Sequence, residues 1–157
     1  MQKITPFLWF DGKAEEAANY YTSIFKNSKI TSVTRCGEAG PGPKGSVLTM
    51  SFQLEGQDFY ALNGGPMFKF TPAISLFVNC ESQAEVDELW EKLSAGGKTS
   101  QCGWLDDKFG VSWQIIPTTL MKLMQDKDPN KANRVMQAML QMTKIDIAGL
   151  KAAYDQP

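Results

Sequence analysis

The sequence predicts an α+β fold in which one βαβββ unit occurs twice and a helical tail follows. Two stretches indicate the repeat: Gly56–Asn63 and Gly110–Pro117 each place a glycine turn before a strand, so that Tyr60 matches Gln114. The apolar positions of two predicted helices also match, at a constant offset of 69 residues. We therefore expect a single domain over residues 1–157, with module one at 1–66, module two at 67–117 and the tail at 118–157.

The first module is predicted to form a strand, a helix and three further strands. Alternating apolar residues predict strands at Ile4–Phe10, Lys29–Cys36, Ser46–Leu54 and Asp58–Asn63. The segment Gly37–Gly45 holds four glycines and two prolines, which predicts a loop long enough to act as a lid. The helix lies between the first two strands, and its spacing of apolar residues predicts one buried stripe made of Ala14, Ala17, Ala18, Tyr21, Ile24 and Phe25.

The second module repeats this order. Ala73–Val78 is an apolar strand, and Ser82 with Glu85 forms a capping box that begins a helix. Gly96-Gly97 ends this helix, and Lys98–Leu105 supplies one or two short strands. The buried stripe of the helix is predicted to be Val86, Leu89, Trp90 and Leu93.

The stretch Asp107–Pro117 closes the second module with a tight turn at Gly110 and a strand. Alternation places Ser112, Gln114 and Ile116 on one face of that strand. An amide in an apolar strand must find a partner or line a cavity, because burying it unpaired costs about 1–3 kcal/mol. Gln114 is therefore the first candidate for a site residue.

The tail is predicted to be helical. Its first helix carries Leu120, Met121, Leu123 and Met124, and Asp128-Pro129 begins a second one as an N-cap followed by proline. Asp146 is expected to cap a last short helix. Five of the eight methionines lie in this tail, which favours adaptable packing against the sheet or a second subunit.

Composition excludes several classes of function. The net charge of −1 gives no reason to expect a nucleic acid or membrane partner, no apolar run approaches the ~18 residues that cross a bilayer, and the N-terminus lacks a signal-peptide core. We therefore expect a cytoplasmic protein. Cys36, Cys80 and Cys102 form no CxxC pair and are expected to be small buried hydrophobes. The absence of histidine excludes Ser-His and Cys-His catalysis and every histidine-containing metal site.

Several stretches together resemble one known family. The chain is similar to PhnB-like proteins, also called 3-demethylubiquinone-9 3-methyltransferase-like, within the glyoxalase or vicinal-oxygen-chelate superfamily. The resemblance implies two curved mixed sheets around a cavity and a homodimer, and it is expected to cover nearly the whole chain. The stretches that carry it are Thr5–Gly12, Ala14–Ala17, Tyr20-Tyr21, Ala61–Pro66, Gly110–Pro117 and Met139–Met142.

The resemblance also locates the positions where enzymes of the superfamily hold a metal, on the first and last strand of each module. Here these positions correspond to Phe7 (or Pro6, if the register slips by one), Tyr60, Ser75 and Gln114. Such side chains do not make a divalent-metal site, which needs several carboxylate, carbonyl, imidazole or thiolate ligands. We therefore expect neither a metal nor a cofactor.

Three hypotheses about function remain open. The first is a protein that binds a small, largely apolar molecule, with Trp104 near the mouth of the cavity; the alternative is that the same residues fill a closed core. The second is an enzyme, either a metal-independent isomerase or lyase with Tyr60 as acid, or the methyltransferase that the family name suggests. The third is a purely structural or partner-binding module. The expected ligand-binding residues are Phe7, Trp9, Tyr60, Ser75, Phe77, Trp104 and Gln114.

Two further observations bear on the enzyme hypothesis. No glycine-rich loop joins a predicted strand to a helix, and no acidic ribose partner follows one, so methyl transfer from S-adenosylmethionine has little support in the sequence. The acids Asp58, Asp106 and Asp107 lie at predicted turns and are expected to be solvated carboxylates. Whether the chain catalyses a reaction is left open.

Overall fold

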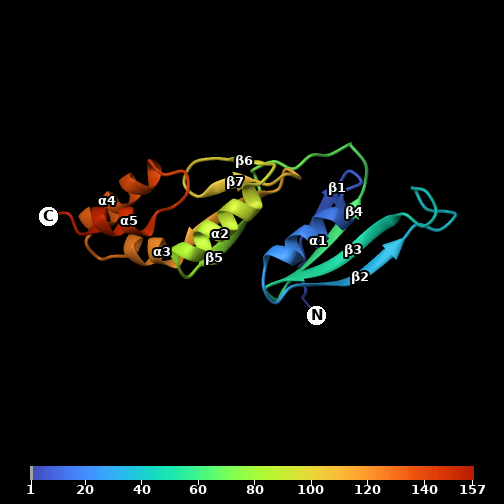
Figure 1. Cartoon of the computed structure of the whole chain (residues 1–157), viewed down its shortest axis with the longest axis horizontal. Coiled ribbons are helices and arrows are strands. Elements are labelled where there is room, and N and C mark those ends of the chain that lie inside the picture. Colours follow the sequence, from blue (N-terminus) through green and yellow to red (C-terminus); the bar gives the residue numbers. More distant parts are fainter. Residues whose placement is uncertain (1) are drawn as a thin grey trace. The chain divides into compact units, whose positions relative to one another are not determined.

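The computed structural model describes residues 2–157, which form two compact units divided between Phe70 and Thr71. Each unit contains one mixed sheet of four strands and a helix, in the chain order β-α-β-β-β (Figure 1). The α+β fold and the repeat predicted from the sequence are therefore confirmed. The tail adds three helices to the second unit.

The first unit contains β1 (Phe7–Phe10), α1 (Ala14–Ile24), β2 (Lys29–Arg35), β3 (Val47–Leu54) and β4 (Gln57–Asn63). The strand order is β1-β4-β3-β2. The pair β1 and β4 is parallel, whereas the other two pairs are antiparallel. The first strand is shorter than predicted because its ladder to β4 begins only after Pro6, whose carbonyl accepts from the Tyr60 amide.

The helix α1 lies over one face of the sheet in the first unit (Figure 1), and the buried residues of this unit lie between the two. The small residues Ala14, Ala17 and Ala18 are fully buried, so the helix approaches the sheet closely. The alternation of β3 and β4 directs every second side chain towards this helix. The sheet residues buried on this side are Phe10, Met50, Phe52, Leu54, Phe59 and Ala61.

The second unit contains β5 (Ser75–Cys80), α2 (Gln83–Ser94), β6 (Lys98–Thr99), β7 (Trp104–Asp106) and β8 (Ser112–Pro117). The strand order is β5-β8-β7-β6, with β5 and β8 parallel, so the topology repeats that of the first unit. The strand β5 begins two residues later than predicted, because its partner β8 begins only at Ser112, after the Gly110 turn. The helix α2 covers one face, where Val86, Leu93, Leu105 and Ile115 are fully buried.

The tail packs on the sheet of its own unit. It consists of α3 (Thr118–Met124), α4 (Pro129–Leu140) and α5 (Ile147–Tyr154). Its core joins Ile116 of β8 to Leu120, Val135, Ile145 and Leu150, with Met124, Met139 and Met142 packed around this cluster. Within residues 2–157, no helix is long and apolar enough to cross a membrane.

Helix capping follows the sequence in two cases and differs in a third. The Ser82 hydroxyl accepts from the Glu85 amide, and the Asp128 carboxylate accepts from the Asn130 amide. Asp146 occupies the N-cap position of α5, but its side chain makes no capping hydrogen bond. Instead, the Ile147 amide donates to Oε1 of Gln83, on α2, at 2.8 Å. The side-chain cap expected from Asp146 is thus wrong, because a distant amide provides the acceptor.

Candidate functional site

The predicted site residues of the second unit lie on the face of its sheet that α2 does not cover, called here the open face. Strand register aligns Phe77, Gln114 and Trp104 as neighbours on β5, β8 and β7, and we name this set the Gln114 row. Phe77 is 47% exposed, while Gln114 and Trp104 are half-buried. The row therefore presents one amide between two aromatic side chains.

Gln114 is held by a hydrogen bond from its own amide. Its Nε2 atom donates to Oγ of Ser75 at 2.9 Å. Ser75 is the register partner of Ser112, so it reaches Gln114 diagonally across the parallel pair. The register counterpart of Phe7 in this unit is Phe77, and not Ser75 as expected from the sequence. The hydrogen bond to Ser75 uses the Nε2 donor of Gln114 and leaves its Oε1 acceptor available on the open face.

The first unit has a corresponding open face, on the side of its sheet away from α1. Phe7 and Tyr60 are register partners there, with ring centroids 5.4 Å apart. They are 55% and 40% exposed. Ser51 follows Tyr60 in the same row, and its hydroxyl lies within hydrogen-bonding distance of Thr31 and Ser32. This face is aromatic beside β1 and hydroxyl-rich beside β2.

Trp9 differs from the other predicted site residues because it packs against the chain that follows β4. Its indole Nε1 donates to the Gly65 carbonyl at 2.9 Å, and Phe68 meets its ring edge-on at 4.9 Å. A Cβ atom on Gly64 would lie 2.3 Å from the ring, so only glycine fits there. Trp9 therefore orders residues 64–68 in the first unit.

The turn that positions Gln114 is built around Asp107. This carboxylate is only 3% exposed, and it accepts from the Phe109 and Val111 amides and from the Trp113 indole. Gly110 has a φ of +90°, a conformation that favours glycine. The expectation that Asp107 is a solvated turn carboxylate is wrong, because three donors replace the water that it loses. The role of Asp107 as the acceptor that holds this turn together was not predicted from the sequence. The spacing Asp-x-x-Gly before a strand could have indicated it.

The residues at the positions where the resemblance would locate metal ligands do not fit a divalent cation. By register these positions bring Phe7 beside Tyr60 and Phe77 beside Gln114, so one phenol and one amide are the oxygen groups present. In the part of the chain that the structure describes, no cluster of three or more histidine, cysteine or acidic side chains could hold a metal ion. No step of a reaction is therefore assigned to a metal.

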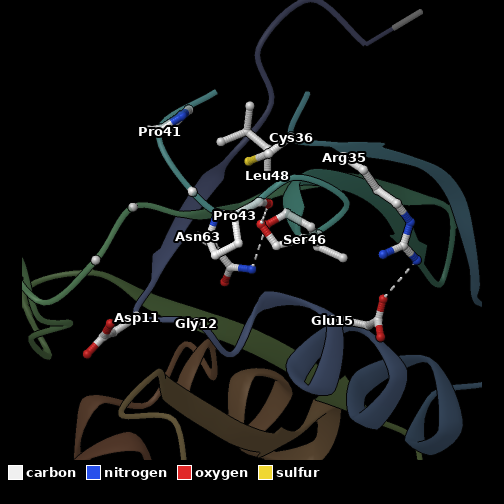
Figure 2. A pocket seen from close by; sticks show the side chains of 14 residues that line it. Asp11, Gly12, Glu15, Arg35, Cys36, Pro41, Pro43, Ser46, Leu48 and Asn63 are labelled. Carbon is white, nitrogen blue, oxygen red and sulfur yellow. Dashed lines mark hydrogen bonds and ion pairs between the residues drawn. The ribbon is translucent and has the colours of Figure 1, made fainter. Parts of the chain in front are cut away.

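A cavity of about 590 Å³ lies elsewhere in the first unit, beneath the loop predicted to act as a lid (Figure 2). Two of its charged side chains pair with each other: Arg35 lies 3.6 Å from the Glu15 carboxylate, and it also donates to the Gly45 carbonyl. Asn63 accepts from the Ala14 amide and donates to the Val47 carbonyl. None of the predicted site residues lines this cavity, whose walls are Asp11, Gly12, Glu15, Arg35, Cys36, Pro41, Gly42, Pro43, Ser46, Val47, Leu48, Asn63, Gly64 and Gly65.

The three cysteines differ in their surroundings. Cys36 and Cys80 are buried, as expected, and burial together with Glu85 and Glu81 raises the pKa of Cys80 to about 12. Cys102 is half-exposed, contrary to expectation, because it lies in the turn before β7 with a φ of +60°. None of them lies in the Gln114 row.

Comparison with known proteins places the chain in a family. The family model described as 3-demethylubiquinone-9 3-methyltransferase matches residues 2–116. The chain belongs to this PhnB-like family. A PhnB protein from Bacillus cereus is 45% identical, with a TM-score of 0.69, and the match covers 74% of this chain and 99% of that one.

Two further structures extend the comparison of the PhnB-like fold. A Pseudomonas aeruginosa protein is 22% identical over 74% of this chain and 98% of its own, with a TM-score of 0.62. A glyoxylase/bleomycin resistance protein/dioxygenase domain from Frankia is 16% identical over 74% of this chain and 92% of its own, with a TM-score of 0.50. These likenesses show the glyoxalase-superfamily fold. No curated protein matches the chain.

The family match ends before the tail. It stops at residue 116, and α3 begins at Thr118. We expected the resemblance to cover nearly the whole chain, but the family model does not include the helical tail. The two sheets with their helices constitute the part that the family shares.

Proposed function

We propose that this PhnB-like protein binds a small, largely apolar molecule on the open faces of its sheets, without a metal. The observation that carries the proposal is the Gln114–Ser75 pair, an oriented amide placed among aromatic side chains. Ligand sites typically combine apolar walls with a few fixed polar groups. Phe77 and Trp104 would contact the apolar body, and Oε1 of Gln114 would accept a hydrogen bond.

The aromatic row of the first unit supports the same proposal. Phe7 and Tyr60 leave large apolar surfaces exposed beside polar hydroxyls, which suits an apolar molecule with a polar substituent. Trp9 would contribute indirectly, because its ring and its indole hydrogen bond order residues 64–68. A reaction without a metal, with Tyr60 as the acid, is the second candidate, since the Tyr60 phenol lies on this face.

The test is a fragment screen followed by NMR of the ¹⁵N-labelled protein. We expect small, mostly apolar fragments to shift the side-chain signals of Gln114 and Trp104. Gln114→Leu should keep the fold at a cost of about 1–2 kcal/mol and abolish binding of the same fragments, whereas the exposed Gln156→Leu serves as the matched control. A Leu variant that binds the fragments with unchanged affinity contradicts the proposal, as does a screen in which neither signal moves.

Methyl transfer is the alternative that the family description names. Calorimetric titration with S-adenosylmethionine tests it directly. We expect no binding, because no glycine-rich loop joins a strand to a helix N-terminus in the described chain. A micromolar dissociation constant would favour the methyltransferase instead.

A further inference from the structure

A second row of side chains crosses the open face of the second unit, next to the Gln114 row. Strand register aligns Ser75, Ser112, Asp106 and Lys98 across β5, β8, β7 and β6, and we name this set the Asp106 row. Ser75 links the two rows, because its hydroxyl accepts from Gln114. A charged row thus lies beside an aromatic one on a single sheet.

The Asp106 carboxylate is oriented by a buried hydroxyl. Oγ of Ser112 donates to Oδ1 of Asp106 at 2.6 Å, and Ser112 is only 1% exposed. A hydrogen bond between a hydroxyl and a carboxylate is among the stronger ones in proteins. This hydrogen bond fixes the position of Oδ1, and the orientation of the carboxylate then determines where Oδ2 lies.

The second oxygen of Asp106 is only loosely paired. Its neighbour is Nζ of Lys98 at 3.7 Å, on a side chain that is 80% exposed, whereas the Asp106 side chain is 27% exposed. An exposed ion pair of this kind contributes little to stability. Since a carboxylate can accept about four hydrogen bonds, Oδ2 keeps capacity for a further donor.

A cavity of about 300 Å³ lies beside Asp106. Its lining includes Asp106 and Trp104, together with Pro72, Lys98, Thr99 and Ser100. Trp104 also belongs to the Gln114 row, where it is the register partner of Gln114. One small molecule can therefore place its apolar body on Trp104 and its polar group at Asp106.

We infer that the ligand carries a hydrogen-bond donor, a hydroxyl or an amine, on an apolar ring system, and that Asp106 recognises this donor. The inference rests on the proposed binding function and names the chemical class of its ligand. A carboxylate on the same ring is disfavoured, because Asp106 repels it and Lys98 is too exposed to compensate.

Three probes that share a naphthalene ring test the inference: 2-naphthol, 2-methoxynaphthalene and 2-naphthoate. Titrations of the full chain are followed by NMR at the Trp104 indole and by quenching of tryptophan fluorescence. We expect 2-naphthol to bind most tightly and 2-naphthoate least tightly. Asp106→Asn should weaken 2-naphthol binding by about tenfold and leave 2-methoxynaphthalene within about twofold, because a charged acceptor is replaced by a neutral one.

Matched variants separate recognition from folding. Asp106→Asn retains an acceptor for Ser112, and thermal unfolding checks that the sheet is intact. The exposed Asp155→Asn removes the same charge elsewhere and should change nothing. Lys98→Ala should maintain or strengthen 2-naphthol binding, because Oδ2 loses its competitor.

The outcomes distinguish this inference from the function on which it rests. If 2-naphthol and 2-methoxynaphthalene bind with equal affinity and Gln114→Leu weakens the binding of both, the inference about Asp106 is overturned. The proposed binding function is then still supported. Tight binding of 2-naphthoate that Lys98→Ala abolishes overturns the inference in favour of an anionic ligand. If no probe binds and the fragment screen also fails, both proposals are rejected.

Discussion

Gln114 is the side chain on which the chemistry of the proposed site depends. A neutral amide at this position can donate and accept at once, whereas a bare carboxylate would carry a desolvation cost. Its donor is used by Ser75 at 2.9 Å, which fixes the direction of the acceptor. In the proposed site, the acceptor of Gln114 is therefore oriented before a ligand arrives.

The expectation that no metal is bound is tested at the same residue. The purified protein should carry no stoichiometric metal, and Gln114→Glu should not create a site, because Phe7, Tyr60 and Phe77 supply no strong ligand. Elemental analysis of both proteins is the measurement. About one zinc, nickel, manganese or iron per chain in the unaltered protein would show that this interpretation of the ligand set is wrong.

Elements of the second unit are joined by a side chain that acts as a clamp. Gln83, on α2, donates to the Ile145 carbonyl at 3.0 Å and accepts from the Ile147 amide at 2.8 Å. It thereby caps α5 and ties the tail to the helix that covers the sheet. The half-buried side chain thus satisfies two backbone groups at the start of the last helix.

Gln83→Ala should destabilise the second unit. Leaving the Ile145 carbonyl and the Ile147 amide without a partner is expected to cost about 1–3 kcal/mol, measured by urea denaturation. The exposed Gln101→Ala, whose side chain has no hydrogen bond among the described residues, is the control and should lie within about 0.5 kcal/mol of the unaltered protein. Equal stabilities of the two variants would contradict the clamp.

A hydrogen bond within the tail, between Tyr154 and Asp126, predicts that the stability of the protein depends on pH. The Tyr154 hydroxyl donates to Asp126 at 2.5 Å, and this bond, with the Asp128 amide, lowers the pKa of Asp126 below its ordinary value of 3.8. Because the folded pKa is depressed, the stabilisation is present above the unfolded pKa and is lost as the pH falls through the folded pKa. Tyr154→Phe should raise the pKa of Asp126, and its stability should converge with that of the unaltered protein as the pH falls through the lowered folded pKa of Asp126.

NMR titration of the Asp126 carboxyl carbon and acid unfolding of both proteins measure these effects. Asp126→Asn removes the titrating group, so adding Tyr154→Phe to it should leave no pH-dependent difference between the two. A stability difference that stays constant from neutral pH down to complete protonation of Asp126 would refute the assignment.

At the scale of the whole molecule, the tail supplies exposed apolar surface as well as packing. Met121 and Leu140 are 46% and 51% exposed, although the neighbouring helix faces are buried around Val135 and Leu150. Proteins that expose apolar surface in this way often bury it against a partner. We propose that the partner is a second copy of the chain, in keeping with the homodimer that the family resemblance implies.

Light scattering should give a mass near twice the 17.4 kDa of one chain at micromolar concentration. Met121→Lys combined with Leu140→Lys should give a folded monomer. Neither residue belongs to the core cluster of the tail, so the substitutions should not disturb its packing. The matched pair Lys122→Met and Lys151→Met changes charge elsewhere in the tail and should not dissociate the dimer. A monomeric mass for the unaltered chain would end the proposal.

Local patterns in the sequence determined the repeat, the helices and the face on which Gln114 lies. These features depend on periodicity and on turn residues such as Gly110, which act over a few neighbouring positions. The Ser82 and Asp128 caps were likewise readable, since donor and acceptor are separated by only three and two residues. The two-module plan needed no knowledge of distant contacts.

The tertiary structure alone decided which distant groups meet. Trp9 and Gly65 are 56 positions apart, and Gln83 and Ile147 are 64 apart. Strand register and helix docking bring these groups together, and no local periodicity specifies either one. Asp107 was expected in solvent but is buried, because the alternation pattern does not show that the Phe109 and Val111 amides and the Trp113 indole converge on its carboxylate.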